Sequence, residues 1–134
     1  MRQAQAILYE TDGRLTKLLS PLFTEQSWRL REMRQLSSVR EILGERVPVL
    51  ILKLGRDLHE ELALLEQVSW TYPDTGTVVV GDVAHPELEG LAWDLGANFV
   101  HFPPLSRDHL PGIVYGLMTG DRRKNIRLPN GKEE

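Results

Sequence analysis

VPVLILKL, at residues 47–54, is an almost unbroken apolar run that is β-branched at several positions and carries one charge, Lys53. Such a run is typical of a central strand in a parallel sheet, because helices cover a strand of that kind on both faces. Gly55 ends the run. The segment therefore predicts a buried strand at the centre of an α/β domain.

Shorter apolar runs on both sides of this strand alternate with helical patterns. Four further strands are predicted, over residues 6–9, 28–33, 77–80 and 98–102. Helical patterns begin near residues 15, 36, 58, 86 and 106, where apolar residues recur at intervals of three and four. Five strands that alternate with five helices pair in parallel through right-handed crossovers. The expected fold is a three-layer α/β sandwich around a doubly wound, parallel, five-stranded sheet.

Three local signals refine the predicted helices. Pro21 lies inside the first helical pattern and should kink that helix or end it early. Asp57 followed by Glu60 has the spacing of a capping box, and Leu58 is expected on the inner face of the helix that follows. Gly96 fits the left-handed position just past the end of the fourth helix.

The composition is that of a single globular domain. The chain has 134 residues, of which 41% are apolar and 26% charged. It has no cysteine, which excludes disulfides and thiolate sites.

No apolar run is long enough to span a membrane and no signal peptide is evident, so a cytoplasmic protein without membrane association is expected. The net charge of −3 argues against broad nucleic-acid binding. Residues 1–119 are expected to form the domain and residues 120–134 a disordered tail.

Two motifs carry a resemblance to a known family. They are PDTGTVVVGD at residues 73–82 and LGANFVHFPP at residues 95–104. Together with the strand at 49–54, their order and spacing resemble the receiver domain of two-component response regulators, over Gln5 to about Met118. The resemblance implies a flavodoxin-like fold with strand order 2-1-3-4-5, and a role in signalling.

The phosphorylation pocket that the resemblance implies is degenerate in this chain. Receivers place an acidic pair after the first strand, the phosphate-accepting aspartate at the end of the third, a threonine or serine at the end of the fourth, and a lysine before a proline after the fifth. The residues at these places are Glu10 and Thr11 with Asp12 one step late, then Lys53, then Gly81 with Asp82 beside it, and Pro103. An ammonium group cannot form an acyl phosphate and repels Mg²⁺, so phosphorylation at the usual position is not expected.

The carboxyl ends of the strands are expected to bring Lys53 close to Glu10. An ion pair between them would put a permanent cation where receivers hold a metal, and Asp12 or Asp82 would be able to join it. The alternative is that Lys53 extends into solvent and contributes little, as exposed charges usually do.

The leading interpretation is a stand-alone receiver-like signalling protein that is not an enzyme and acts by protein–protein interaction. The resemblance places the contact face on the fourth helix, fifth strand and fifth helix, with Trp93, Val100, Phe102 and Tyr115 as its residues. Val100 stands where receivers carry an aromatic switch. The partner would be a kinase, a regulator, an effector or a second copy. No cofactor or metal is expected, since the histidines lack the spacing of metal ligands.

Two alternative functions stay open. An open α/β sheet can bind a small ligand or a substrate in the crevice at the carboxyl ends of its strands, here near Gly55, Gly81 and Asp82. Phosphorylation could also use an atypical acceptor, Asp82 or Asp12. The basic stretch at residues 122–127 could contact an acidic partner or nucleic acid, although such tails are more often simply solvated.

Overall fold

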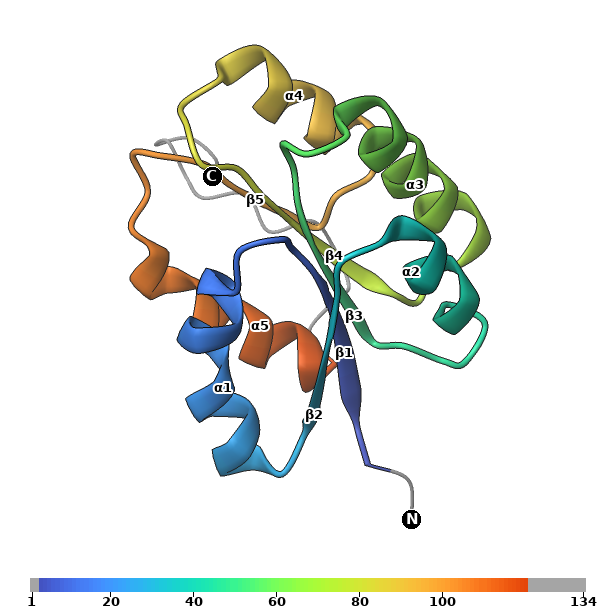
Figure 1. The fold of residues 1–134 in the computed structure, drawn as a ribbon, viewed down its shortest axis with the longest axis vertical. Helices are drawn as coiled ribbons and strands as arrows, with labels where there is room; N and C mark the ends of the chain where they lie inside the picture. The colour runs from blue at the N-terminus through green and yellow to red at the C-terminus, as the bar shows by residue number, and fades with distance from the viewer. Residues whose placement is uncertain (1–2, 121–134) are drawn as a thin grey trace.

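A computed structural model describes residues 3–120, and the tail predicted over residues 120–134 lies outside the described residues apart from Gly120. Five parallel strands form one sheet in the order β2-β1-β3-β4-β5 (Figure 1). The strands are β1 (Gln5–Tyr9), β2 (Arg29–Met33), β3 (Val49–Lys53), β4 (Gly76–Val80) and β5 (Phe99–His101). The predicted fold and strand order are confirmed.

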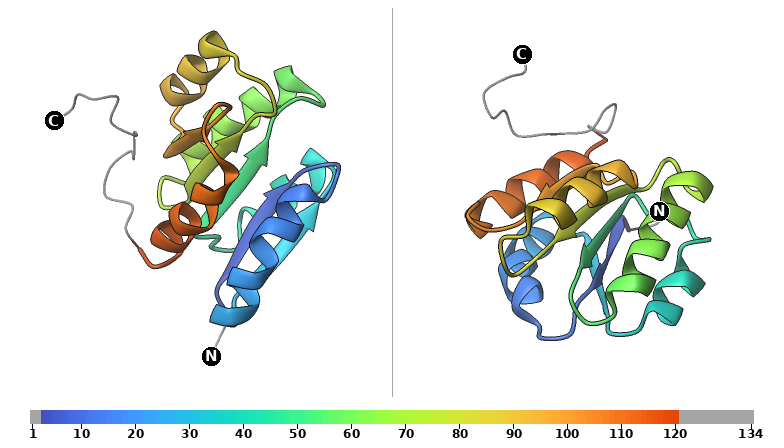
Figure 2. Two further views of the ribbon diagram at one scale, coloured as in Figure 1. Left: turned by 90° about the vertical axis from the view of Figure 1, so that its left-hand side faces the viewer. Right: turned by 90° about the horizontal axis from the view of Figure 1, so that it is seen from above.

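Helices connect each strand to the next and cover both faces of the sheet (Figure 2). They are α1 (Arg14–Gln26), α2 (Leu36–Ile42), α3 (Leu58–Thr71), α4 (Pro86–Asp94), the short 3₁₀ helix η1 (Arg107–His109) and α5 (Leu110–Met118). None of the helices between residues 3 and 120 combines the length and the apolar character needed to cross a bilayer.

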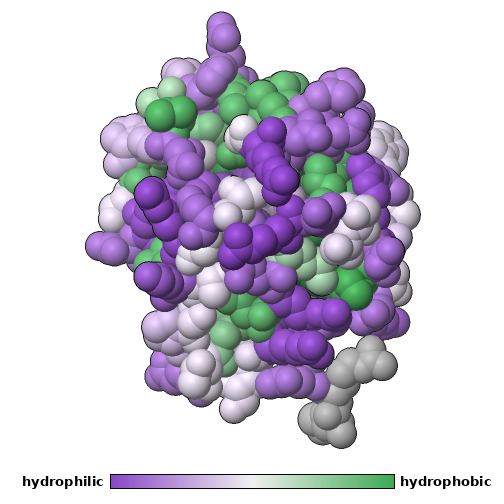
Figure 3. All heavy atoms as spheres, viewed as in Figure 1, coloured by the Kyte–Doolittle hydropathy of each residue, from purple (hydrophilic) through white to green (hydrophobic). Residues whose placement is uncertain are grey.

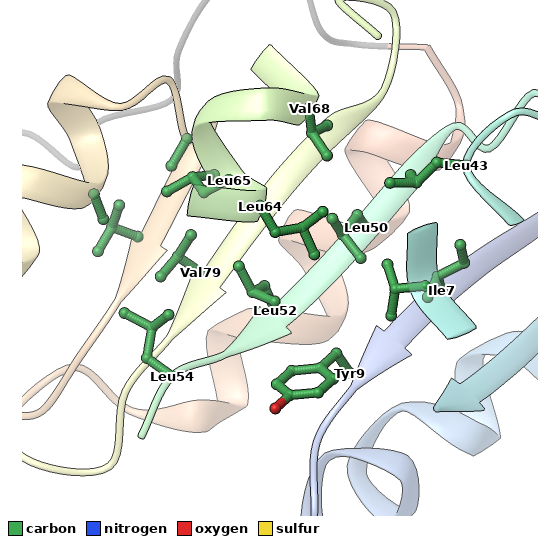
Figure 4. Close-up of a cluster of buried hydrophobic side chains, with 14 of the residues drawn as sticks. Ile7, Tyr9, Leu43, Leu50, Leu52, Leu54, Leu64, Leu65, Val68 and Val79 are labelled. Carbon is green, nitrogen blue, oxygen red and sulfur yellow. The ribbon is translucent and has the colours of Figure 1, made fainter. Parts of the chain in front are cut away.

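The core consists of one apolar cluster on each face of the sheet, because side chains alternate along a strand. On β3, Leu50 and Leu52 join α2, α3 and α4 on one side, and Val49 and Ile51 join α1 and α5 on the other. Figure 4 shows the first cluster, with Tyr9 and Leu64 against these leucines. All five residues of β3 are buried, which confirms its predicted central place. The surface in Figure 3, by contrast, is mostly hydrophilic with scattered apolar areas.

Helix α1 does not end early at its proline. Pro21 lies inside the helix, which continues to Gln26. A proline there removes one backbone hydrogen bond. Beyond the proline, Phe23 is buried in the core, which contributes about 1.5–3 kcal/mol, and Leu22 packs against the same cluster and adds to this gain. The prediction of an early end was therefore wrong, because tertiary packing outweighs the local cost.

The start of α3 also differs from the prediction. Asp57 occupies the N-cap position, but its side chain accepts no capping hydrogen bond. Leu58 is 39% exposed, so it does not belong to the inner face. That face consists of Glu61, Leu64, Leu65 and Val68. The turn is stabilised instead by the buried carboxylate of Glu61, which accepts hydrogen bonds from the backbone N–H groups of Gly55 and Asp57. Gly96, in contrast, adopts the expected left-handed conformation after α4, with φ 109°.

Candidate functional site

The charged residues of the predicted pocket lie at the carboxyl edge of the sheet. Lys53 is the last residue of β3, while Asp12 and Asp82 follow β1 and β4 in the chain. These strands neighbour one another and run in parallel, so their carboxyl ends meet at one place. The local sequence thus delivers three charged side chains to the same edge.

Lys53 forms ion pairs with two aspartates. Its Nζ lies 2.7 Å from Oδ2 of Asp12 and 3.2 Å from Oδ2 of Asp82. The Lys53 side chain is only 7% exposed, whereas that of Asp82 is 50% exposed. Burial of an ammonium group is costly unless carboxylates surround it. The two aspartates meet this requirement, which excludes the alternative that Lys53 extends into solvent.

Arg107 extends the pair into a network. Its Nη2 lies 2.8 Å from Oδ1 of Asp82 and donates to the carbonyl of Gly81 at 3.3 Å. Arg107 belongs to η1, after β5, so the contacts join the end of β3 to the segments that follow β1, β4 and β5. We call Asp12, Lys53, Asp82 and Arg107 the pocket ion network. It contains two cations and two anions, and Asp12 also lies 3.8 Å from the guanidinium of Arg14.

Glu10 is not a partner of Lys53, so that part of the prediction was wrong. Its carboxylate is buried and accepts hydrogen bonds at 2.9 Å from the backbone N–H groups of Leu15 and Thr16, and from the Thr16 hydroxyl. The first N–H groups of a helix have no partner within the helix and attract anions. Glu10 therefore caps α1. Thr11 contributes its carbonyl, which accepts a hydrogen bond from Arg34.

Gly81 is required by the close approach of an aromatic ring. A Cβ at this position would lie 2.6 Å from Cδ2 and Cζ of Phe102, and closer still to Cε2. The ring thus fills the space that a threonine or serine side chain would need. Pro103, the next residue, joins Pro104 through a cis peptide bond. Neither residue brings a hydroxyl or an ammonium group to the pocket.

Two residues predicted for the interaction face are buried. Val100 is 3% and Phe102 2% exposed, and both belong to the core cluster beneath α3 and α4. Side chains alternate along β5, so these two point toward the covering helices instead of solvent. Trp93 is half-buried against both clusters, and Tyr115 on α5 is 44% exposed. Of the four predicted residues, Tyr115 is the most accessible.

Sequence reasoning missed a buried acid beside the pocket. Glu61 is fully buried and accepts a hydrogen bond at 3.0 Å from the hydroxyl of Tyr9, besides those from the loop after β3. Burial, together with the neighbouring Glu61 carboxylate, raises the pKa of Tyr9 to about 12. The available signal was an acidic residue in the first turn of a helix, which favours backbone N–H groups nearby.

His101, at the end of β5, was also missed. It is fully buried, and its Nε2 donates to the carbonyl of Ser106 at 2.9 Å. Its Nδ1 has no hydrogen-bond partner among residues 3–120. The contact ties β5 to the loop that carries Arg107, so it fixes one end of the pocket ion network.

The pairing with Lys53 lowers the pKa values of both pocket aspartates. The hydrogen bond from Lys53, followed by that from the backbone N–H of Arg14, lowers the pKa of Asp12 to about 2. Partial burial acts to raise the pKa of Asp82, but hydrogen bonds from Arg107 and Lys53 outweigh it, and the pKa falls. Both carboxylates are therefore ionised at neutral pH. Within residues 3–120, no three acidic or histidine side chains are grouped so that they could hold a metal ion.

Acid should weaken the fold through Asp12. Its folded pKa lies below the unfolded value of 3.8, so the unfolded chain binds the proton more readily and stability falls as the pH drops from about 4 to about 2. We expect the free energy of unfolding, measured in urea across this range, to fall less in Asp12→Asn than in the unmodified protein. Asp94→Asn, at an exposed acid outside the network, should follow the unmodified protein. Identical slopes for Asp12→Asn and the unmodified protein would contradict the pairing.

A groove of about 580 Å³ opens at the opposite, amino edge of the sheet. Its lining comes from three segments, which are residues 3–5, residues 43, 44 and 46–48, and residues 71–75. The crevice that the sequence predicts for small ligands, near Gly55, Gly81 and Asp82, lies at the other edge, where β3 and β4 end.

Known structures resemble this fold over most of the chain. An orphan response regulator of H. pylori is 14% identical with a TM-score of 0.72, over 86% of this chain and 96% of that one. A CheY-like receiver domain protein from Methanospirillum hungatei is 17% identical with a TM-score of 0.69, over 87% and 94%. The response regulator DrrB of Thermotoga maritima is 14% identical with a TM-score of 0.75, over 96% and 58%. No family model and no curated protein matches the sequence. The chain therefore has the fold of response regulator receiver domains.

Proposed function

We propose that this protein is a receiver-fold signalling module that acts by protein–protein interaction and is not phosphorylated in its pocket. The observation that carries the proposal is the ammonium group of Lys53, held between Asp12 and Asp82 at the end of the central strand. The fold supports a signalling role by analogy, since similar structures are response regulators. The chemistry of the pocket supports the absence of phosphorylation.

Phosphoryl transfer to the pocket lacks an acceptor and a metal site. A carboxylate must attack phosphorus to form an acyl phosphate, and Lys53 cannot do so at the position that points into the pocket. Mg²⁺ needs several hard oxygen ligands in near-octahedral geometry. Asp12 and Asp82 have such oxygens, but both are already neutralised by Lys53 and Arg107. A metal ion would have to displace a cation that is attached to the fold.

The same contacts disfavour Asp12 and Asp82 as atypical acceptors. Phosphorylation of Asp82 would remove a carboxylate oxygen from the ion pair with Arg107. Phosphorylation of Asp12 would remove a carboxylate oxygen from the ion pair with Lys53. An acyl phosphate also carries about two negative charges where the carboxylate carried one, which exceeds the charge that Lys53 and Arg107 balance within the network. The module is therefore a constitutive one, with no group-transfer chemistry and no enzymatic activity.

The proposed contact face lies on α4 and α5. Leu91 is 42% and Tyr115 44% exposed, and both are large apolar side chains on these helices. Aromatic residues are enriched at protein interfaces. The buried Val100 and Phe102 support the face from within. A sensor kinase, a regulator, an effector or a second copy of this chain is the class of partner that fits a receiver fold.

The test is a titration of the ¹⁵N-labelled protein with Mg²⁺ and beryllofluoride, followed by nuclear magnetic resonance. We expect no shift of the amide signals of Asp12, Gly81 and Asp82, because beryllofluoride needs a carboxylate acceptor and a bound metal. Cross-linking to binding partners in a lysate should give the same products with and without these additions. Shifts centred on Gly81 would show that the pocket accepts a phosphoryl group, and would refute the proposal.

A further inference from the structure

Hydrogen bonds join two of the segments that line the groove at the amino edge. The Thr75 hydroxyl donates to the carbonyl of Val47 at 2.7 Å, and the N–H of Gly76 donates to the carbonyl of Pro48 at 2.8 Å. These bonds tie the loop before β3 to the loop before β4. Binding sites for small molecules have volumes of roughly 300–1,000 Å³ and are largely preformed. The groove, at about 580 Å³, fits this description.

Two opposite charges from different loops line this groove. Arg46 comes from the loop before β3 and Asp74 from the loop before β4, and both are exposed. Neither makes an ion pair or a side-chain hydrogen bond within residues 3–120. They therefore do not neutralise each other, although they belong to the same groove. Pro48, Tyr72 and Pro73 also line this groove and give it an apolar part.

The backbone of Arg46 is strained. Its φ is 26°, in a region that favours glycine and costs other residues free energy. A glycine, Gly44, lies only two residues away, so the loop does not lack a flexible residue. Strained residues that persist are concentrated at sites where ligands bind. The conformation holds Arg46 at the groove in spite of its cost.

We propose that the amino-edge groove binds a small zwitterion, an amino acid or a short peptide with an apolar side chain. The carboxylate of the ligand pairs with Arg46, its ammonium group pairs with Asp74, and its side chain lies against Tyr72 and the neighbouring prolines. A ligand with both charges neutralises two unpaired groups at once, which a simple anion or cation does not. This site lies at the opposite edge from the pocket ion network and does not depend on the function proposed for that network.

The test titrates the ¹⁵N-labelled full-length protein with leucine and with the dipeptide leucyl-leucine. The amide signals of Gly44, Thr71 and Thr75 should shift and saturate below about 10 mM ligand. N-acetyl-leucine lacks the ammonium group and leucine amide lacks the carboxylate, so each should bind at least about tenfold more weakly. Whichever of leucine and leucyl-leucine binds more tightly shows which separation of carboxylate and ammonium group fits the groove.

Variants separate this site from unspecific effects. Arg46→Gln and Asp74→Asn should each weaken binding by about tenfold or more, whereas Lys17→Gln and Asp94→Asn, at exposed charges elsewhere, should leave it unchanged. Arg46→Gly should also lose binding while raising the melting temperature by a few degrees, because it removes the strain together with the guanidinium. The proposal is overturned if no probe gives a saturable shift, if the blocked compounds bind as tightly as leucine, or if both charge variants bind normally.

Discussion

Lys53→Asp should destabilise the protein by about 2–4 kcal/mol in the absence of divalent cations, and Mg²⁺ should restore part of the loss. The substitution replaces an ammonium group that lies 2.7 Å from Asp12 and 3.2 Å from Asp82 with a third carboxylate. Breaking a buried pair costs several kcal/mol, but the two aspartates are partly exposed and water reduces the repulsion. Thermal unfolding in EDTA should show a decrease of roughly 10 °C in the melting temperature.

The recovery by Mg²⁺ is the more specific outcome. Three carboxylates at the ends of neighbouring strands supply hard oxygen ligands, which is the kind of site that Mg²⁺ prefers. A metal ion that binds only the folded chain raises its stability by mass action. The melting temperature of Lys53→Asp should therefore rise with millimolar Mg²⁺, while that of the unmodified protein should not change.

Lys53→Met provides the matched control. Methionine removes the charge at nearly the same length but adds no carboxylate, so the loss should be smaller, about 1–2 kcal/mol, and Mg²⁺ should have no effect. If Lys53→Asp were as stable as the unmodified protein in EDTA, the ammonium group would not be held between the two aspartates. The function proposed for the pocket would then lose its basis.

Gly81→Ser should cost about 3 kcal/mol, although it restores a residue type that receivers carry at this position. The new Cβ would lie 2.6 Å from two atoms of the Phe102 ring and closer to a third. The ring is buried in the core and cannot move aside without displacing its neighbours. Denaturation in urea measures the loss. Gly90→Ala, at a helical glycine whose Cβ would meet nothing within 4 Å, should instead stabilise the protein by about 0.5–1 kcal/mol.

A double-mutant cycle identifies the cause of that loss. Phe102→Ala alone should cost about 3–5 kcal/mol because it leaves a cavity. In this background the ring is gone, so Gly81→Ser should cost less than about 1 kcal/mol. Contacting residues are coupled, whereas independent ones add to within about 0.5 kcal/mol. Additive costs would mean that the glycine is needed for another reason.

Much of the fold was predictable because it depends on local patterns. The apolar run ending at Lys53 predicted the central strand, and its complete burial follows from helices on both faces. Alternation of strands and helices then restricted the sheet to parallel pairing. Local rules failed where packing opposed them: Pro21 did not end α1, and Leu58 did not face the core. In both places burial of other side chains along the helix decided the outcome.

The candidate site was predictable in its residues but not in its contacts. The sequence brought Asp12, Lys53 and Asp82 to one edge, since parallel strands end together. It did not predict that Glu10 would cap α1 and leave Lys53 to the aspartates. Nor did it predict Arg107, which lies 25 residues from Asp82 and reaches it through a turn of 3₁₀ helix.

By itself the sequence determined the α/β architecture, the order of the elements and the presence of a lysine where an acceptor carboxylate would stand. Only the tertiary structure decided which carboxylates neutralise that lysine, that Phe102 fills the space beside Gly81, and that Arg46 and Asp74 line one groove. The periodicity of strands and helices depends on residues that are neighbours in the chain, so it can be predicted from the sequence. The choice among partners depends on distances of a few ångströms between segments far apart in the chain, and packing alone sets those distances.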